Sequence, residues 1–157
     1  MSAPYAPPSS RRIPAPGTHP AVAKYDYASA YELVVPFQPP PARWWAKAVF
    51  ETVPPAFDWF VKFGWRFALG LKLGPRESPE LVAGWPVIAD NGVELVMGAS
   101  SWLLDTQNIV TLSHGRVTWV TVVRYRKPLA RVVWALAAPI HHLSITKLLT
   151  RAARSLT

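Results

Sequence analysis

The chain has 157 residues, which is the usual size of one domain and enough to bury a substantial apolar core. It contains no cysteine, which excludes disulfides, a thiol nucleophile and cysteine-ligated metals. Lysine and arginine number 17 against 9 aspartates and glutamates. The resulting net charge of +8 favours an anionic partner, either nucleic acid or a phospholipid surface.

Residues 1–22 are rich in proline, alanine and serine and offer almost nothing to bury. We therefore expect a disordered tail, followed by a single folded domain over residues 23–157. The proline-rich tail is also a candidate contact for a protein partner. It lacks the apolar run of a signal peptide, and no later stretch is as free of charge as a membrane span, so we expect a cytoplasmic protein.

The folded domain is predicted to begin with a strand at Tyr25–Val35, where side chains alternate in character and prolines follow. A helix is then predicted from Pro41 to Thr52, because apolar residues recur three and four positions apart. A second helix, Ala56–Leu71, carries one narrow polar stripe and is otherwise apolar. Such a helix is buried on most sides or faces a cavity or a membrane, and burial is the commoner case.

After a loop at residues 76–84, the chain has the pattern of an antiparallel meander. The Asn91-Gly92 pair lies between two apolar runs and predicts a tight hairpin, because both residues tolerate positive φ. The predicted strands are Gly84–Asp90, Val93–Trp102, Leu104–Leu112 and Arg116–Lys127. With the first strand, they make an antiparallel sheet of about five strands.

The chain ends in a predicted long helix from Pro128 to Leu156, with proline suited to the first helical position. Its first half has one apolar stripe, formed by Leu129, Val132, Val133, Leu136 and Ile140. Its second half has another, formed by Ile145, Leu148, Leu149, Ala152 and Leu156 and rotated well round the axis. We expect a kink at Pro139, a first half clamped against the sheet and a different neighbour for the second half. The order of elements predicts an α+β fold.

Three stretches of the chain together resemble one superfamily. They are FGWRFALGLKLGPR (residues 63–76), SSWLL (residues 100–104) and VVRYRKPLARVVWALAAPIHH (residues 122–142). Over residues 25–155 the chain is similar to the START-like superfamily, also called SRPBCC or polyketide-cyclase-like, and within it to an actinobacterial branch of unknown function. The resemblance implies a helix-grip fold, in which a curved antiparallel sheet holds the long C-terminal helix and leaves an apolar cavity. It transfers no catalytic residue.

A ligand cavity between the sheet and the C-terminal helix is therefore the leading functional hypothesis, and the aromatic second helix supports it independently. Taken singly, each candidate is more often an ordinary core residue. The candidate lining residues are Trp59, Phe63, Phe67, Met97, Trp119, Leu136 and Ile140. The expected occupant is an apolar or amphipathic small molecule, such as a lipid or a polyketide.

An enzyme of the cyclase, aromatase or dehydratase type is the alternative, and it requires an ionisable group inside the cavity. The candidates are Asp105, His141 and His142, although a strand end or a satisfied histidine explains them equally well. The two histidines point about 100° apart on a helix and have no partner motif, so we expect no metal and no cofactor. A third possibility is an interaction module that binds a protein and no ligand.

Three basic residues, Lys147, Arg151 and Arg154, lie on one side of the final helix. They are suited to an anionic membrane surface, which would place the protein at the inner face of the membrane. The plain alternative is that cations stabilise the C-terminal end of a helix. Nucleic acid is a weaker candidate, because the basic residues are dispersed and no reader motif is present.

Overall fold

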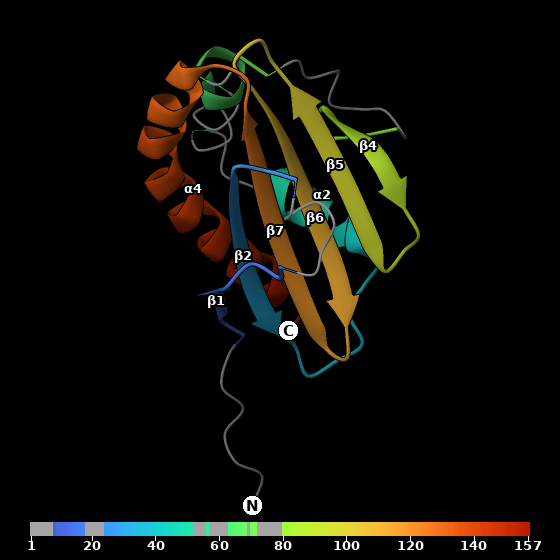
Figure 1. Ribbon diagram of the computed structural model, residues 1–157. Helices are drawn as coiled ribbons and strands as arrows, with labels where there is room; N and C mark the ends of the chain where they lie inside the picture. Colours follow the sequence, from blue (N-terminus) through green and yellow to red (C-terminus); the bar gives the residue numbers. More distant parts are fainter. Residues whose placement is uncertain (1–7, 18–23, 52–55, 57–62, 69, 72–79) are drawn as a thin grey trace, which may run out of the picture.

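The computed structural model describes residues 8–17, 24–51, 56, 63–68, 70–71 and 80–157. These residues form an antiparallel seven-stranded sheet with helices α2 and α4 on one face (Figure 1). The strands are β1 (Ser10–Ile13), β2 (Tyr27–Val34), β3 (Leu81–Val82), β4 (Trp85–Asp90), β5 (Glu94–Ser100), β6 (Leu104–Ser113) and β7 (Arg116–Tyr125). The helices are α2 (Ala42–Glu51), the short π-helical turn η1 (Gly64–Ala68) and α4 (Pro128–Arg154). The α+β prediction is confirmed.

The sheet has the order β1-β2-β7-β6-β5-β4-β3, and every pairing in it is antiparallel. The predicted meander is therefore correct. Its turns form as their residues dictate: Gly92 and Gly115 have positive φ, and the Asn91 side chain accepts hydrogen bonds from the backbone N–H groups of Val93 and Glu94. The expectation of about five strands is wrong, because two short strands are added at the sheet edges.

Strand β1 comes from the segment that was expected to be a disordered tail. The Ser10 backbone N–H donates to the Thr150 hydroxyl at 3.0 Å, and the Ser10 hydroxyl donates to the Thr146 carbonyl. Arg11 pairs with the Glu32 carboxylate at 3.1 Å. Residues 10–13 are thus ordered by polar contacts with β2 and α4, which hydrophobic patterning does not reveal. At the other edge, β3 lies in the predicted loop and consists of only two residues.

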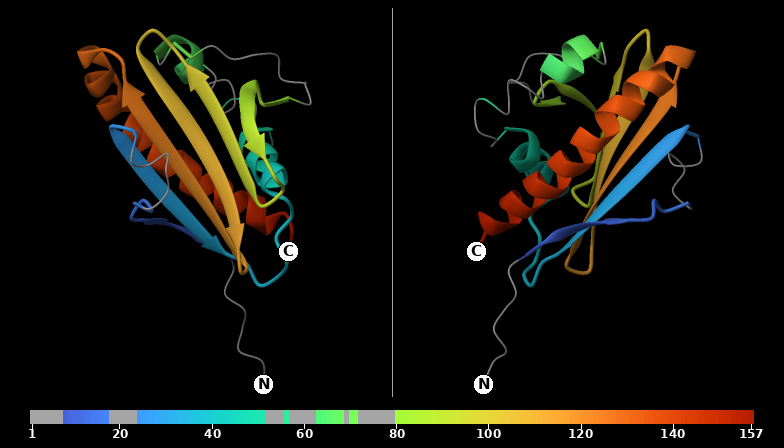
Figure 2. Two further views of the ribbon diagram at one scale, coloured as in Figure 1. Left: turned by 45° about the vertical axis from the view of Figure 1, so that its right-hand side comes forward. Right: turned by 90° about the vertical axis from the view of Figure 1, so that its left-hand side faces the viewer.

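The predicted second helix, Ala56–Leu71, falls largely outside the described residues. The described part at its C-terminal end is η1. The first predicted helix is confirmed as α2, which buries one face containing Trp45, Val49 and Phe50. Helix α2 lies on the same face of the sheet as α4 and packs against it (Figure 2).

Helix α4 is a single helix through Pro139, and it crosses the sheet diagonally (Figure 2). Its buried residues lie along one line over its whole length: Ala130, Trp134, Ile145, Leu148, Leu149, Ala152 and Ala153. The apolar stripe predicted for the second half is therefore buried, apart from Leu156. Of the stripe predicted for the first half, Val133 packs against the core, but the other four residues are about half exposed or more, so the expectation that this stripe is clamped against the sheet is wrong. Because the helix is continuous, the face that the second half buries continues through the first half.

By length and composition alone, α4 is able to cross a membrane, with a mean hydropathy of 1.3 in its most apolar 18-residue window. The expectation that this helix is too charged for a membrane span is therefore not met. Core helices of soluble domains pass the same test.

Candidate functional site

A cavity of about 550 Å³ lies between the first half of α4 and the inner face of the sheet. Helix α2 and the turn η1 close one side of it, and β4, β6 and β7 contribute the floor. Its walls are mostly aromatic and aliphatic, and they include Phe50, Trp65, Trp85, Val133, Trp134 and Ile145. The cavity opens to solvent beside α4, where Ile140 and Phe63 are about half exposed and Leu136 is more exposed still.

The aromatic wall is held in place by packing around Phe50, which α2 presents toward the sheet. Its ring lies 5.0 Å from that of Trp65 and 5.2 Å from that of Trp119, both edge to face. It also stacks on Trp85 at 5.9 Å. Such contacts each add about 0.5–1.5 kcal/mol beyond the burial of area. The wall is therefore a preorganised surface for an apolar ligand.

The floor of the cavity carries a small polar group on β6 and β7. Asn108 and Thr121 are opposite each other in the strand register, and both point inward. The Asn108 Oδ1 atom accepts from Trp119 Nε1 at 3.2 Å and from the Thr121 hydroxyl at 2.7 Å. This network satisfies the carbonyl oxygen of Asn108 in an otherwise apolar core, as burial of a polar group requires.

Three residues of the wall carry buried polar atoms that have no hydrogen-bond partner in the described part of the chain. They are Trp85 Nε1, Trp134 Nε1 and His141 Nε2. The two tryptophans are only 2% and 4% exposed. A buried unsatisfied polar group costs about 1–3 kcal/mol. The orphaned atoms are shielded from water in this conformation, so a bound molecule would reach them only after the wall side chains shift.

The two adjacent histidines of α4 have different surroundings. His141 lines the cavity, and burial lowers its pKa to about 3, with further lowering by His142 and Arg12. It is therefore neutral at physiological pH. His142 points instead toward β2, where its two ring nitrogens contact the hydroxyls of Tyr27 and Tyr31.

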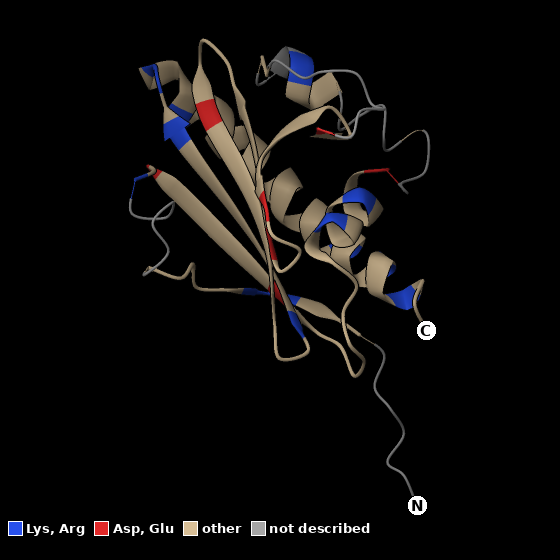
Figure 3. Ribbon diagram, turned by 90° about the vertical axis from the view of Figure 1, so that its right-hand side faces the viewer, with Lys and Arg blue, Asp and Glu red and all other residues tan. Residues whose placement is uncertain are grey.

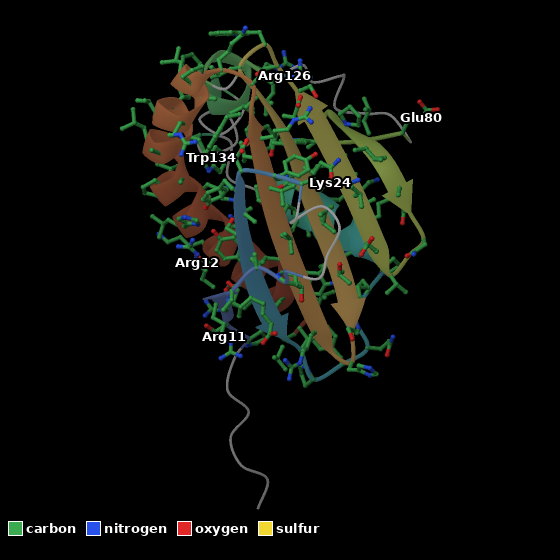
Figure 4. All side chains as sticks on the ribbon, in the orientation of Figure 1. Arg11, Arg12, Lys24, Glu80, Arg126 and Trp134 are labelled. Carbon is green, nitrogen blue, oxygen red and sulfur yellow. The ribbon has the colours of Figure 1, made fainter. Side chains whose placement is uncertain are left out.

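Burial and the nearby Arg12 also lower the pKa of His142. Arg12 lies on β1, at the edge of the sheet beside α4, while Trp134 lies nearer the N-terminal end of that helix (Figure 4). Because both ring nitrogens of His142 are engaged by tyrosines, this side chain fastens α4 to β2. His142 is not in the cavity lining, and the prediction that it serves as a cavity base has no support in this geometry.

Asp105 lies on the outer face of β6, away from the cavity. Burial alone would raise its pKa, but hydrogen bonds from Arg126, Ser100 and Arg124 outweigh that effect and lower the pKa. Arg124 Nε donates to the carboxylate at 3.0 Å and Arg126 Nε at 2.9 Å. The carboxylate is thus committed to an ion-pair network, and its candidacy as a cavity base is wrong. In the strand pattern, odd-numbered residues of β6 face outward, which the sequence alone did not settle.

The predicted lining residues are divided by the structure. Phe63, Leu136 and Ile140 line the cavity. Met97 and Trp119 are fully buried in the core and do not line it. Trp59 and the side chain of Phe67 lie outside the described residues.

Several wall residues were missed by sequence reasoning. Trp134 could have been found by extending the second-half stripe of α4 backward through Pro139, because it falls on the same line as His141, which was among the candidates. Trp85, at the start of β4, carried no periodic signal. Within the described residues, no group of three or more metal-ligating His, Asp or Glu side chains comes together.

Comparisons with known proteins identify no relative: the chain matches no family model, and neither a curated protein nor a solved structure is significantly similar to it.

Proposed function

We propose that this domain binds an apolar or amphipathic small molecule, lipid-like or polyketide-like, in the cavity between the sheet and α4. The observation that carries the proposal is a preformed cavity of about 550 Å³ with an aromatic wall and an opening beside the helix. Ligand pockets commonly measure about 300–1,000 Å³ and combine apolar walls with a few polar groups. The helix-grip arrangement implied by the resemblance to the START-like superfamily is part of this proposal.

The chemistry of the wall supports an amphipathic occupant over a pure hydrocarbon. The unpaired N–H groups of Trp85 and Trp134 belong to two residues of the lining. After a small shift of the indoles, a ligand carboxyl, carbonyl or hydroxyl oxygen would accept from them, while the carbon skeleton would contact the aromatic wall. His141, being neutral, adds a ring nitrogen without adding a charge that the ligand would have to neutralise.

Binding is better supported than catalysis. A carrier requires only volume and an opening, whereas a cyclase or dehydratase requires an ionisable group that faces the substrate. Among the three acid–base candidates, only His141 lines the cavity, and its pKa of about 3 makes it neutral at pH 7 and a poor general acid and a weak general base. Asp105 and His142 are engaged elsewhere.

The proposal is tested by native mass spectrometry of the protein purified from its own host, followed by extraction and identification of any released molecule. Two matched variants make the test specific. Ala137→Trp fills the cavity, because Ala137 lines it, whereas Ala135→Trp places the same side chain on the exposed side of the same helix. We expect a bound mass in the wild type and in Ala135→Trp that is lost in Ala137→Trp.

Binding of N-phenyl-1-naphthylamine, an apolar fluorescent probe, supplies a second readout when no molecule copurifies. Thermal unfolding of both variants checks that they fold. Equal probe binding by the two variants, or no probe binding and no copurifying mass in the wild type, would refute the cavity as a binding site.

A further inference from the structure

The exposed face of α4 carries an unbroken apolar row. Leu129, Val132, Leu136, Ile140 and Leu143 are spaced three and four residues apart, and between 48% and 74% of each side chain is exposed. We call these five residues the α4 stripe. At 1.5 Å per residue it is about 21 Å long. A continuous row of this length on one helix face indicates an interaction site, whereas apolar residues that are exposed singly do not.

The α4 stripe continues in line into a basic segment. Lys147, Arg151 and Arg154 follow Leu143 at spacings of four, four and three residues, and all three are exposed. Figure 3 shows these cations toward the C-terminal end of the helix. There is no aspartate or glutamate anywhere in α4. One helix face is therefore apolar over its first half and purely cationic over its second.

The mouth of the cavity opens on this same face. Leu136 and Ile140 belong both to the α4 stripe and to the cavity lining, and the half-exposed Phe63 lies at the opening too. If another apolar surface covered the stripe, an apolar molecule could pass from that surface into the cavity without crossing water.

We propose that this face of α4 docks on an anionic phospholipid bilayer, with the α4 stripe among the acyl chains and the basic segment on the lipid phosphates. The inference deepens the proposed function, since it assigns the source from which the cavity ligand is collected. Charge complementarity selects this occupant. A helix face that is apolar at one end and cationic at the other inserts its apolar end into the interface and prefers anionic lipid. A second copy of the chain would offer these cations no acidic residue on α4 to meet.

Flotation of the full-length protein with vesicles tests the proposal. We expect binding to vesicles of equimolar phosphatidylcholine and phosphatidylglycerol, and weaker binding to phosphatidylcholine alone. Val132→Ser and Leu143→Ser remove stripe side chains that do not line the cavity, and each is expected to weaken partitioning about ten-fold. The matched control is Ile88→Ser, at a side chain 58% exposed on β4, which should change nothing.

The charge contribution is tested by Lys147→Gln, with Lys24→Gln as its control. Lys24 is exposed and precedes Tyr25, which packs against the outer face of the sheet. Loss of Lys147 is expected to weaken binding to the anionic vesicles about five-fold and to leave binding to neutral vesicles unchanged. Loss of Lys24 should have no such effect.

Two results would overturn the inference. The first is the absence of a stripe effect: the wild-type protein binds neither vesicle type, or the stripe variants bind the vesicles as well as the wild type does. The second is a dimer in light scattering that Leu143→Ser makes monomeric while vesicle binding is absent, which would assign the stripe to a second copy. Probe binding without vesicles separates this inference from the proposed function: Val132→Ser leaves the cavity lining intact, so its probe affinity reports on the cavity alone.

Discussion

Replacement of Leu149 by alanine tests the orientation of α4, on which both proposals depend. The Leu149 side chain has no exposed surface and packs in the main core with Ile145 and Leu148. The substitution removes three carbon groups at about 0.8 kcal/mol each, or about 2.4 kcal/mol of burial. A cavity of about 40 Å³ left behind adds about 1 kcal/mol. We expect the free energy of unfolding to fall by about 3–4 kcal/mol.

Leu136→Ala is the matched control, because it makes the same change on the same helix. The Leu136 side chain is 74% exposed, so its loss should alter the free energy of unfolding by less than about 0.5 kcal/mol. Urea unfolding followed by circular dichroism measures the free energy of unfolding of both variants. An unchanged slope of that free energy against urea concentration checks that the transition stays two-state. A larger loss for Leu136→Ala than for Leu149→Ala would show that the first-half stripe faces the sheet, and would refute the reasoning.

Two further predictions concern the polar groups around the cavity. Asn108→Leu removes the acceptor shared by Trp119 and Thr121. We expect urea unfolding to show a free energy of unfolding that is lower by about 1–3 kcal/mol. An unchanged midpoint would mean that water or another group replaces the acceptor. The pKa of His141 is about 6.5 in the unfolded chain and about 3 in the folded chain. Between these values only the unfolded chain binds the proton, so the free energy of unfolding falls as the pH drops, by up to about 1.4 kcal/mol per pH unit. His141→Phe should flatten that dependence between pH 7 and 5, and a slope identical to the wild type would show that His141 stays accessible to protons.

The strands of the sheet were largely predictable, because alternation and turn chemistry act locally. The meander from β4 to β7 follows from apolar runs separated by Asn91-Gly92 and His114-Gly115, and Gly92, His114 and Gly115 do adopt positive φ in the structure. The two edge strands were not predictable in the same way. Ser10–Ile13 is held by contacts with residues of β2 and α4 that lie far along the chain, and no local pattern encodes them.

The candidate site was predicted less well than the sheet, for a physical reason that α4 makes clear. A helical wheel shows which residues share a face, but not which of two apolar faces the core will cover. In α4 the face with Leu149 is buried and the face with Leu136 is not, although both are rich in leucine. Met97 and Trp119 were assigned to the wall because they are large and apolar, and the same property places them in the fully packed core.

The position of β2 between β1 and β7 also has a consequence for the order in which the chain is synthesised. Tyr27 pairs with Val123, so the long neighbour of β2 is made almost a hundred residues after it. At about 5–20 residues per second, β2 waits roughly 5–20 s on the ribosome for that neighbour. During this time its inward-facing Tyr31 and Leu33, which have no exposed surface in the finished domain, lack their cover. A newly made chain therefore passes through an interval of aggregation risk, and chaperone contact with this segment would protect it.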